Sequence, residues 1–161
     1  MTPHDFLDQV VRPNVHDALA RPDDFQAISN AILTMDALVG ITAWHLRDNG
    51  DPSVANLPDD VLDMKYRDTL AGSSSAYKAL SDASASLKHG RLTRPKTPPR
   101  VMTDRKQMTA DRNTIDYMQA GIDPIGCNLV FLDLTSGRRA ARDIIHDAFY
   151  YLSQLVSGLP P

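Results

Sequence analysis

The segment from Phe25 to about Leu46 constrains the fold of this chain more than any other part of the sequence. Apolar residues recur along it at helical spacing, at positions 25, 28, 32, 35, 38, 39, 43, 44 and 46. Ala31, Leu33, Ala37 and Ile41 make the same segment apolar on most of its sides. Such a helix is expected in the middle of a helical bundle rather than on its surface.

Four other segments have the spacing or the end signals of helices. The first begins at Thr2-Pro3 and is expected to kink or break near Arg12, because Pro13 follows. The others are expected at about 58–71, at about 75–88 and from just after Gly137 to about Ser157. All 20 acidic residues are Asp, so helix starts are expected to use Asp, Ser, Thr and Pro.

Residues 128–134 are the best candidate for a strand, and a second short strand is expected at 100–103. The prediction is therefore a mainly α fold, a four- to five-helix bundle with a small β element before the last helix. Its 161 residues are expected to form a single domain. Residues 91–126 are expected to form an irregular, basic, proline-containing insertion within this domain.

Several classes of protein are excluded by what the sequence lacks. No apolar run reaches about 18 residues, so no membrane span is expected. The start, MTPHDFLDQ, lacks the features of a signal peptide, which favours a cytoplasmic location. Cys127 is the only cysteine, and no histidines are paired at zinc spacing. Neither a metal nor a cofactor is expected.

Positive charge is concentrated between residues 88 and 106, a segment that we call the basic strip. It holds seven Lys and Arg residues against one acid, Asp104, although the whole chain has a net charge of −3. Two interpretations stay open: the strip recruits phosphate, or it docks on the protein's own acidic surface. Lys88, His89, Arg91 and Arg94 are the candidate phosphate-binding residues. The placement of Lys88 and His89 is also explained by the negative end of the helix dipole.

Asp36 stands out because it lies within the most apolar helix. A buried carboxylate there needs a basic partner, expected from the 75–88 helix or from the last helix. A structural ion pair is the favoured interpretation.

Several stretches, taken in order along the chain, resemble a bacterial protein family with a HEPN-like helical bundle. They are FLDQVVRPNV (6–15), Asn30-Ala31 with Asp36-Ala37, YRDTLA (66–71), the helix end at Lys88-His89, and the late strand, turn and helix. The resemblance implies a helical bundle that often forms homodimers. It also implies a relation to toxin or defence proteins, some of which are metal-independent ribonucleases that use an Arg followed four to six residues later by His.

Two places in the sequence could hold such a pair. Ser81 occupies the position where these relatives carry an Arg ahead of Lys88-His89. In the last helix, the spacing puts Arg139, Arg142 and His146 on one flank, where His146 could move the 2′-hydroxyl proton and an Arg could hold the phosphate. Ala140 follows Arg139 where the family motif has Asn. A solvated flank with local pairs to Asp143 and Asp147 explains the same pattern.

The first hypothesis is therefore a non-enzymatic binding or interaction module. Its basic strip engages an anionic partner, such as RNA, or the protein's own acidic face. The alternative is a metal-independent ribonuclease in which Arg139, Arg142 and His146 form the site.

Overall fold

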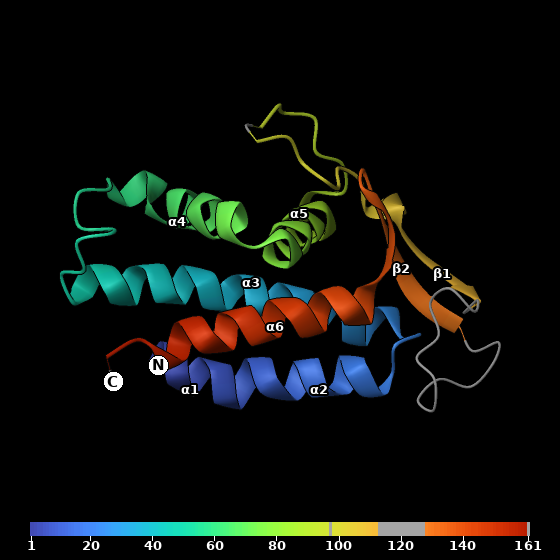
Figure 1. Cartoon of the computed structure of the whole chain (residues 1–161), viewed down its shortest axis with the longest axis horizontal. Helices are drawn as coiled ribbons and strands as arrows, with labels where there is room; N and C mark the ends of the chain where they lie inside the picture. Colours follow the sequence, from blue (N-terminus) through green and yellow to red (C-terminus); the bar gives the residue numbers. More distant parts are fainter. Residues whose placement is uncertain (97, 113–127, 161) are drawn as a thin grey trace.

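The computed structural model describes residues 1–96, 98–112 and 128–160. Within them the chain forms five helices and a three-stranded antiparallel sheet, which confirms a mainly α fold with a small β element before the last helix. Figure 1 shows α4 and α5 above the pair formed by α3 and α6, with the first helix below. The first helix consists of three consecutive segments, α1 (Pro3–Phe6), η1 (Leu7–Val11) and α2 (Arg12–Ala20). The other four are α3 (Phe25–Asp48), α4 (Asp59–Ser73), α5 (Ser75–His89) and α6 (Ala141–Ser157).

The first helix is continuous through α1, η1 and α2, and its expected break takes the form of a change of helix type. Residues Leu7–Val11 form a wide π-helical turn, after which an ordinary α-helix begins at Arg12. The backbone N–H of Arg12 donates to the carbonyl of Leu7, five residues earlier. Pro13 lies in the first turn of α2, a place where its missing N–H is tolerated.

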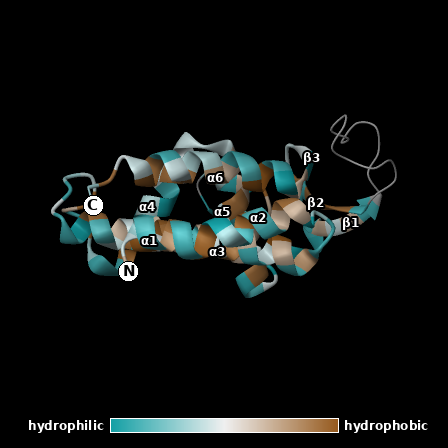
Figure 2. Cartoon of the chain, turned by 90° about the horizontal axis from the view of Figure 1, so that it is seen from below, coloured by the Kyte–Doolittle hydropathy of each residue, from teal (hydrophilic) through white to brown (hydrophobic). Residues whose placement is uncertain are grey.

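α3, the helix predicted from Phe25, lies between the first helix on one side and α4 and α5 on the other, as its apolar composition requires. α3 contacts α2, α4, α5 and α6, and Figure 2 shows it on the side of the bundle opposite α6. By length and composition alone, α3 would also pass as a membrane span, and 56% of its most apolar window is buried inside the protein. The core helix of a water-soluble protein passes the same test.

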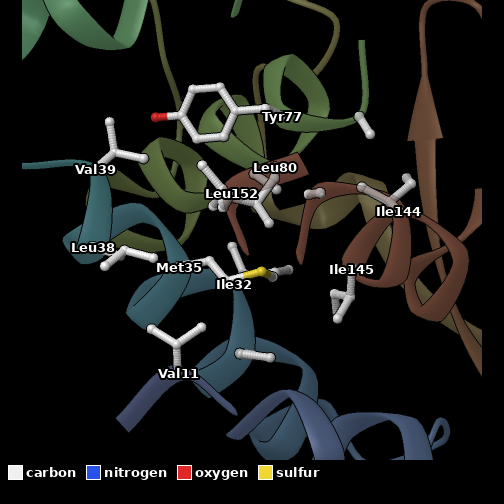
Figure 3. Close-up of a cluster of buried hydrophobic side chains, with 14 of the residues drawn as sticks. Val11, Ile32, Met35, Leu38, Val39, Tyr77, Leu80, Ile144, Ile145 and Leu152 are labelled. Carbon is white, nitrogen blue, oxygen red and sulfur yellow. The ribbon is translucent and has the colours of Figure 1, made fainter. Parts of the chain in front are cut away.

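The main hydrophobic core is built from residues that five helices turn inward. Figure 3 shows its centre, where α3, α5 and α6 meet the first helix. Among its fully buried side chains are Val11, Ile32, Met35, Leu38, Tyr77, Leu80, Ile144 and Leu152. Burial of such side chains contributes about 1.5–3 kcal/mol each, so this cluster holds the helices together.

The sheet joins β1 (Met108–Arg112), β2 (Asn128–Leu134) and β3 (Gly137–Ala140) in that order, with β2 in the centre. The expected strand at 128–134 is confirmed as β2. The expectation that the last helix starts directly after Gly137 is wrong, because residues 137–140 pair with β2 and the helix begins at Ala141. Gly137 has a φ of 120°, which lets the chain turn back into the hairpin.

The short strand expected at 100–103 is also wrong. The backbone N–H of Val101 donates to the side chain of Asp82 instead of to a ladder. The strand of this region is β1, which follows the short 3₁₀ helix η2 (Arg105–Gln107) and lies within the segment expected to be irregular. Residues 97 and 113–126 of the expected insertion lie outside the described residues.

The chain between α5 and η2 forms a loop with paired ends, which we call the arch (residues 91–104). At its base, Leu92 donates to the carbonyl of Thr103 and Arg105 donates to that of Gly90, at 2.7 and 2.9 Å. Figure 1 shows the arch projecting from the bundle beyond α5. Because its two ends are paired, residues at both ends of the basic strip lie close together.

Candidate functional site

A pocket of about 240 Å³ lies where α3, α4, α5 and the arch meet. Two of the candidate phosphate-binding residues, Lys88 and His89, line it, while Arg91 and Arg94 are not part of its lining. Of the remaining polar lining, Asp36 and Ser81 were considered in the sequence analysis, and Lys96 and Arg100 belong to the basic strip. Asp63, Arg67 and Asp68 were not predicted as site residues.

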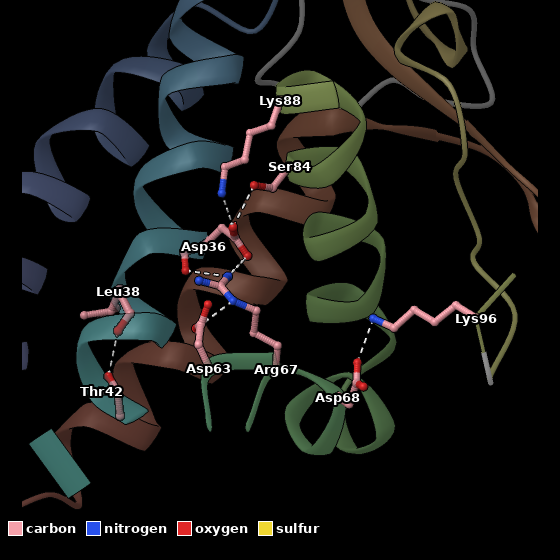
Figure 4. Close-up of polar contacts among 9 residues, drawn as sticks. All are labelled: Asp36, Leu38, Thr42, Asp63, Arg67, Asp68, Ser84, Lys88 and Lys96. Atoms are coloured by element: carbon pink, nitrogen blue, oxygen red, sulfur yellow. Dashed lines mark hydrogen bonds and ion pairs between the residues drawn. The ribbon is translucent and has the colours of Figure 1, made fainter. Parts of the chain in front are cut away.

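Asp36 forms the floor of this pocket and has ion-pair partners from two helices. Its side chain is 6% exposed, and its Oδ2 accepts hydrogen bonds from Ser84 Oγ at 2.8 Å and Lys88 Nζ at 2.7 Å. Its Oδ1 pairs with the guanidinium of Arg67, which also donates to the Asp36 backbone carbonyl at 2.8 Å (Figure 4). The expected ion pair is present through Lys88, and Arg67 of α4 is a second partner that the sequence did not indicate.

Arg67 is held between α3 and α4 by carboxylates on both helices. Its Nε donates to Asp63 Oδ1 at 2.9 Å, one turn earlier in α4. Burial lowers the pKa of Arg67, but Asp36 and Asp63 raise it, and the net shift is upward. A Cβ atom on Gly40 would lie 3.1 Å from both Arg67 Nη2 and Asp63 Oδ1. Gly40 therefore gives this pair the room to lie against α3.

Tyr77 lies beneath the same network and is fully buried. Burial raises its pKa, and the negative charge of Asp36 raises it further. Its hydroxyl has no hydrogen-bond partner within the described residues. The tyrosine therefore stays neutral and contributes packing to the floor of the pocket.

Part of the basic strip is neutralised by the protein's own aspartates. We call Lys88, Lys96 and Arg100 the inner set. Lys88 pairs with Asp36, Lys96 with Asp68 at 2.7 Å, and Arg100 with Asp82 at 2.9 Å. The last two pairs fix the arch to α4 and α5 (Figure 4 shows the first of them). Of the two interpretations of the basic strip, these three residues follow the second, because they pair with acidic residues of the same chain.

The rest of the strip points to solvent. We call Arg91, Arg94, Arg105 and Lys106 the outer set, and all four are exposed. None of them has an ion pair within residues 1–96, 98–112 and 128–160. The paired base of the arch brings Arg91 and Arg105 together, because an isolated bridge joins Arg91 to Asp104. The outer set is therefore a local concentration of positive charge on a chain that is acidic overall.

The candidate ribonuclease residues are only partly brought together. Arg139 is in β3 rather than on the last helix, so the helical spacing that placed it beside Arg142 and His146 does not apply. Arg142 is buried, and its Nε donates to Asp143 at 3.3 Å. Asp147 lies between the other two, 3.2 Å from Arg139 Nη2 and 3.6 Å from Nδ1 of the exposed His146.

A search of the described residues for three or more His, Cys, Asp or Glu side chains that could hold a metal ion finds no such group. Comparisons with family models, with curated proteins and with solved structures find no match for the chain. Functional inference therefore depends on the residues themselves.

Proposed function

We propose that this chain is a cytoplasmic, non-enzymatic binding module with a HEPN-like bundle, and that its outer set engages the phosphates of an RNA. The observation that carries the proposal is the division of the basic strip. The inner set has carboxylate partners within the chain, whereas the outer set has none among the described residues and is exposed. Exposed cations that are not neutralised locally can exchange counterions for phosphates.

The mode of contact follows from the kind of side chains present. The outer set consists of Arg and Lys, and no aromatic residue lies between Leu80 and Asp116. Stacking of bases on aromatic rings is therefore absent from this surface. Binding is expected to depend on the phosphate backbone, to tolerate many sequences and to weaken steeply with salt.

Fluorescence anisotropy of a labelled single-stranded RNA, recorded in EDTA over a range of salt concentrations, tests this proposal. The variant Arg91→Gln/Arg94→Gln is expected to bind about tenfold or more weakly and to show a shallower salt dependence. The matched control is Lys65→Gln/Lys78→Gln, which removes the same charge from α4 and α5 outside the basic strip. Equal affinities for the two variants would contradict the proposal.

The ribonuclease alternative is supported by one observation. Asp147 lies within ion-pair distance of both Arg139 and His146 at the surface, so an Arg and a His can be presented together to a phosphate. The experiment is cleavage of the same RNA in EDTA by wild type, His146→Ala and His89→Ala. Cleavage that is lost only in His146→Ala would establish this site. Intact RNA with folded wild-type protein would exclude it.

A second copy of the chain is the partner that we propose for the outer face of α3. Leu33, Ala37, Ile41 and Trp44 follow one another at helical spacing along this face, and all are at least partly exposed. Trp44 alone is 43% exposed. The stripe carries no charged residue, so a two-fold contact between identical faces brings no like charges together.

A further inference from the structure

The pocket between α4, α5 and the arch is lined by charges of both signs, unlike the outer set. Four cations, Arg67, Lys88, Lys96 and Arg100, line it together with three carboxylates, Asp36, Asp63 and Asp68. On α4 the two more exposed carboxylates, Asp63 and Asp68, flank Arg67, and the opposite side carries cations from α5 and the arch. A simple anion would be attracted by one side of such a pocket and repelled by the other.

One polar atom of this lining, the donor Arg100 Nε, is buried without a hydrogen bond among the described residues. Asp68 Oδ1 is paired with Lys96 Nζ at 2.7 Å. Buried polar atoms are nearly always hydrogen-bonded, so each such exception needs an explanation. A ligand group that accepts a hydrogen bond would satisfy Arg100 Nε.

Size and accessibility narrow the class of ligand further. A volume of about 240 Å³ exceeds that of a single ion or a few waters and is below the range of most cofactor pockets. Lys88 is 45% exposed and His89 is exposed, so both can turn toward an incoming carboxylate. Met64 and Ala85 add an apolar part to the lining.

We propose that this pocket binds a small zwitterion of the α-amino acid class. The ligand's carboxylate lies toward Lys88, His89 and Arg100, and its ammonium group lies toward Asp63 and Asp68. Its side chain lies against Met64 and Ala85. This site is separate from the outer set and does not rest on the proposed RNA contact.

Isothermal titration calorimetry with the protein amino acids, one at a time, tests the proposal. For each amino acid that binds, the amine that lacks its carboxylate and the acid that lacks its amino group are titrated as well. Leucine, for example, is compared with isopentylamine and 4-methylpentanoate. Inorganic phosphate serves as the probe for a simple anion. The result expected is binding of at least one amino acid and much weaker binding of both of its half-molecules.

Two variants locate the site. Asp68→Asn and His89→Ala are each expected to lower the affinity for the amino acid by about tenfold, since each removes one charge-assisted hydrogen bond. Asp60→Asn, on α4 but outside the pocket lining, is the matched control and is expected to bind like wild type. Circular dichroism of each variant confirms that it is folded. Absence of binding by every amino acid, or equal binding of phosphate or of the deaminated acid, would overturn the proposal.

Discussion

Asp36 and Asp63 pair with the same guanidinium but in very different surroundings. The Asp36 side chain is 6% exposed and has two cationic partners, whereas that of Asp63 is 47% exposed and has one. Removing one charge from a buried pair leaves the other charge uncompensated, but removing a screened charge at the surface costs little. The two positions therefore provide an internal comparison of burial.

We expect Asp36→Asn to lower the free energy of unfolding by about 3 kcal/mol, because it leaves Arg67 and Lys88 without their shared buried carboxylate. Asp63→Asn is expected to lower it by less than about 1 kcal/mol. Urea denaturation at neutral pH measures both values. Equal losses of unfolding free energy in the two variants would show that burial does not increase the contribution of the Asp36 ion pair to stability.

Asp24 caps the start of α3 and has a lowered pKa. The backbone N–H groups of Ala27 and Gln26 donate to its Oδ1 at 3.1 and 2.8 Å, and Arg21 adds a positive charge nearby. Because the pKa is lower in the folded chain than in the unfolded one, the charged form contributes stability above the ordinary pKa. That contribution is lost as the pH falls through the folded value.

The variant Asp24→Asn keeps the hydrogen-bond acceptor of the cap but removes the charge. We expect it to be less stable than wild type at pH 7, and the difference to shrink as the pH falls below the ordinary pKa of 3.8 and to vanish below the lower pKa of the folded chain. Chemical denaturation at a series of pH values measures this difference. If the difference in unfolding free energy stays constant with pH, the charge of Asp24 does not contribute to the stability of the cap.

At the scale of elements, the arch is attached to α5 through one buried carboxylate, that of Asp82. Asp82 is 4% exposed at its side chain, and it accepts from Arg100 Nη1 at 2.9 Å and from the backbone N–H of Val101 at 2.8 Å. Asp68, which holds Lys96, is 30% exposed. Asp82 is therefore expected to be the stronger of the two attachments.

We expect Asp82→Asn to loosen the arch while the five helices stay folded. Limited trypsin digestion followed by mass spectrometry should show faster cleavage after Lys96 and Arg100 than in wild type. Asp68→Asn, which loosens only the Lys96 contact, should show a smaller increase. If cleavage of the arch is unchanged in Asp82→Asn, Asp82 is not needed to hold the arch, and its paired base together with the Lys96 and Val101 contacts is sufficient.

The elements that the sequence predicted well are those whose apolar residues recur with helical spacing. The helix from Phe25 is of this kind. The strand at 128–134 was predictable for a related reason, because its short run of bulky apolar residues also reflects burial. By contrast, β1 (sequence MTADR) has little strand character of its own, and only its pairing with β2 makes it a strand. Residues 137–140 continue smoothly into an Arg-rich helix in the sequence, and only the hairpin turn at Gly137 separates them from it.

The candidate site was predictable only where local sequence carries the signal. A charged residue inside an apolar helix pointed to Asp36, and clustered charge pointed to the basic strip. Which cations are neutralised depends on contacts across the fold, such as Lys88 with Asp36, 52 positions apart. For Arg67, the only local signal is its spacing of four residues from Asp63.

At the scale of the whole molecule, the most apolar helix is not enclosed on all sides. Trp44 and its neighbours remain partly exposed on the outer face of α3. We expect the protein to sediment as a dimer and Trp44→Asp to sediment as a monomer, because the substitution places two carboxylates near the two-fold axis. Phe25→Asp changes an aromatic residue that is 41% exposed at the start of the same helix, away from the stripe, and should remain dimeric. A monomeric wild type would contradict this arrangement.

The central claim is that the inner set of the basic strip stabilises the fold, whereas the outer set binds RNA. The measurement that tests it most directly compares two double variants that each remove two positive charges, Arg91→Gln/Arg94→Gln and Lys96→Gln/Arg100→Gln. For each, the free energy of unfolding and the affinity for a labelled single-stranded RNA are measured in the same buffer. The first variant is expected to lose affinity and keep its stability to within about 0.5 kcal/mol. The second is expected to lose stability and keep its affinity. Equal effects of both variants on both quantities would contradict the division.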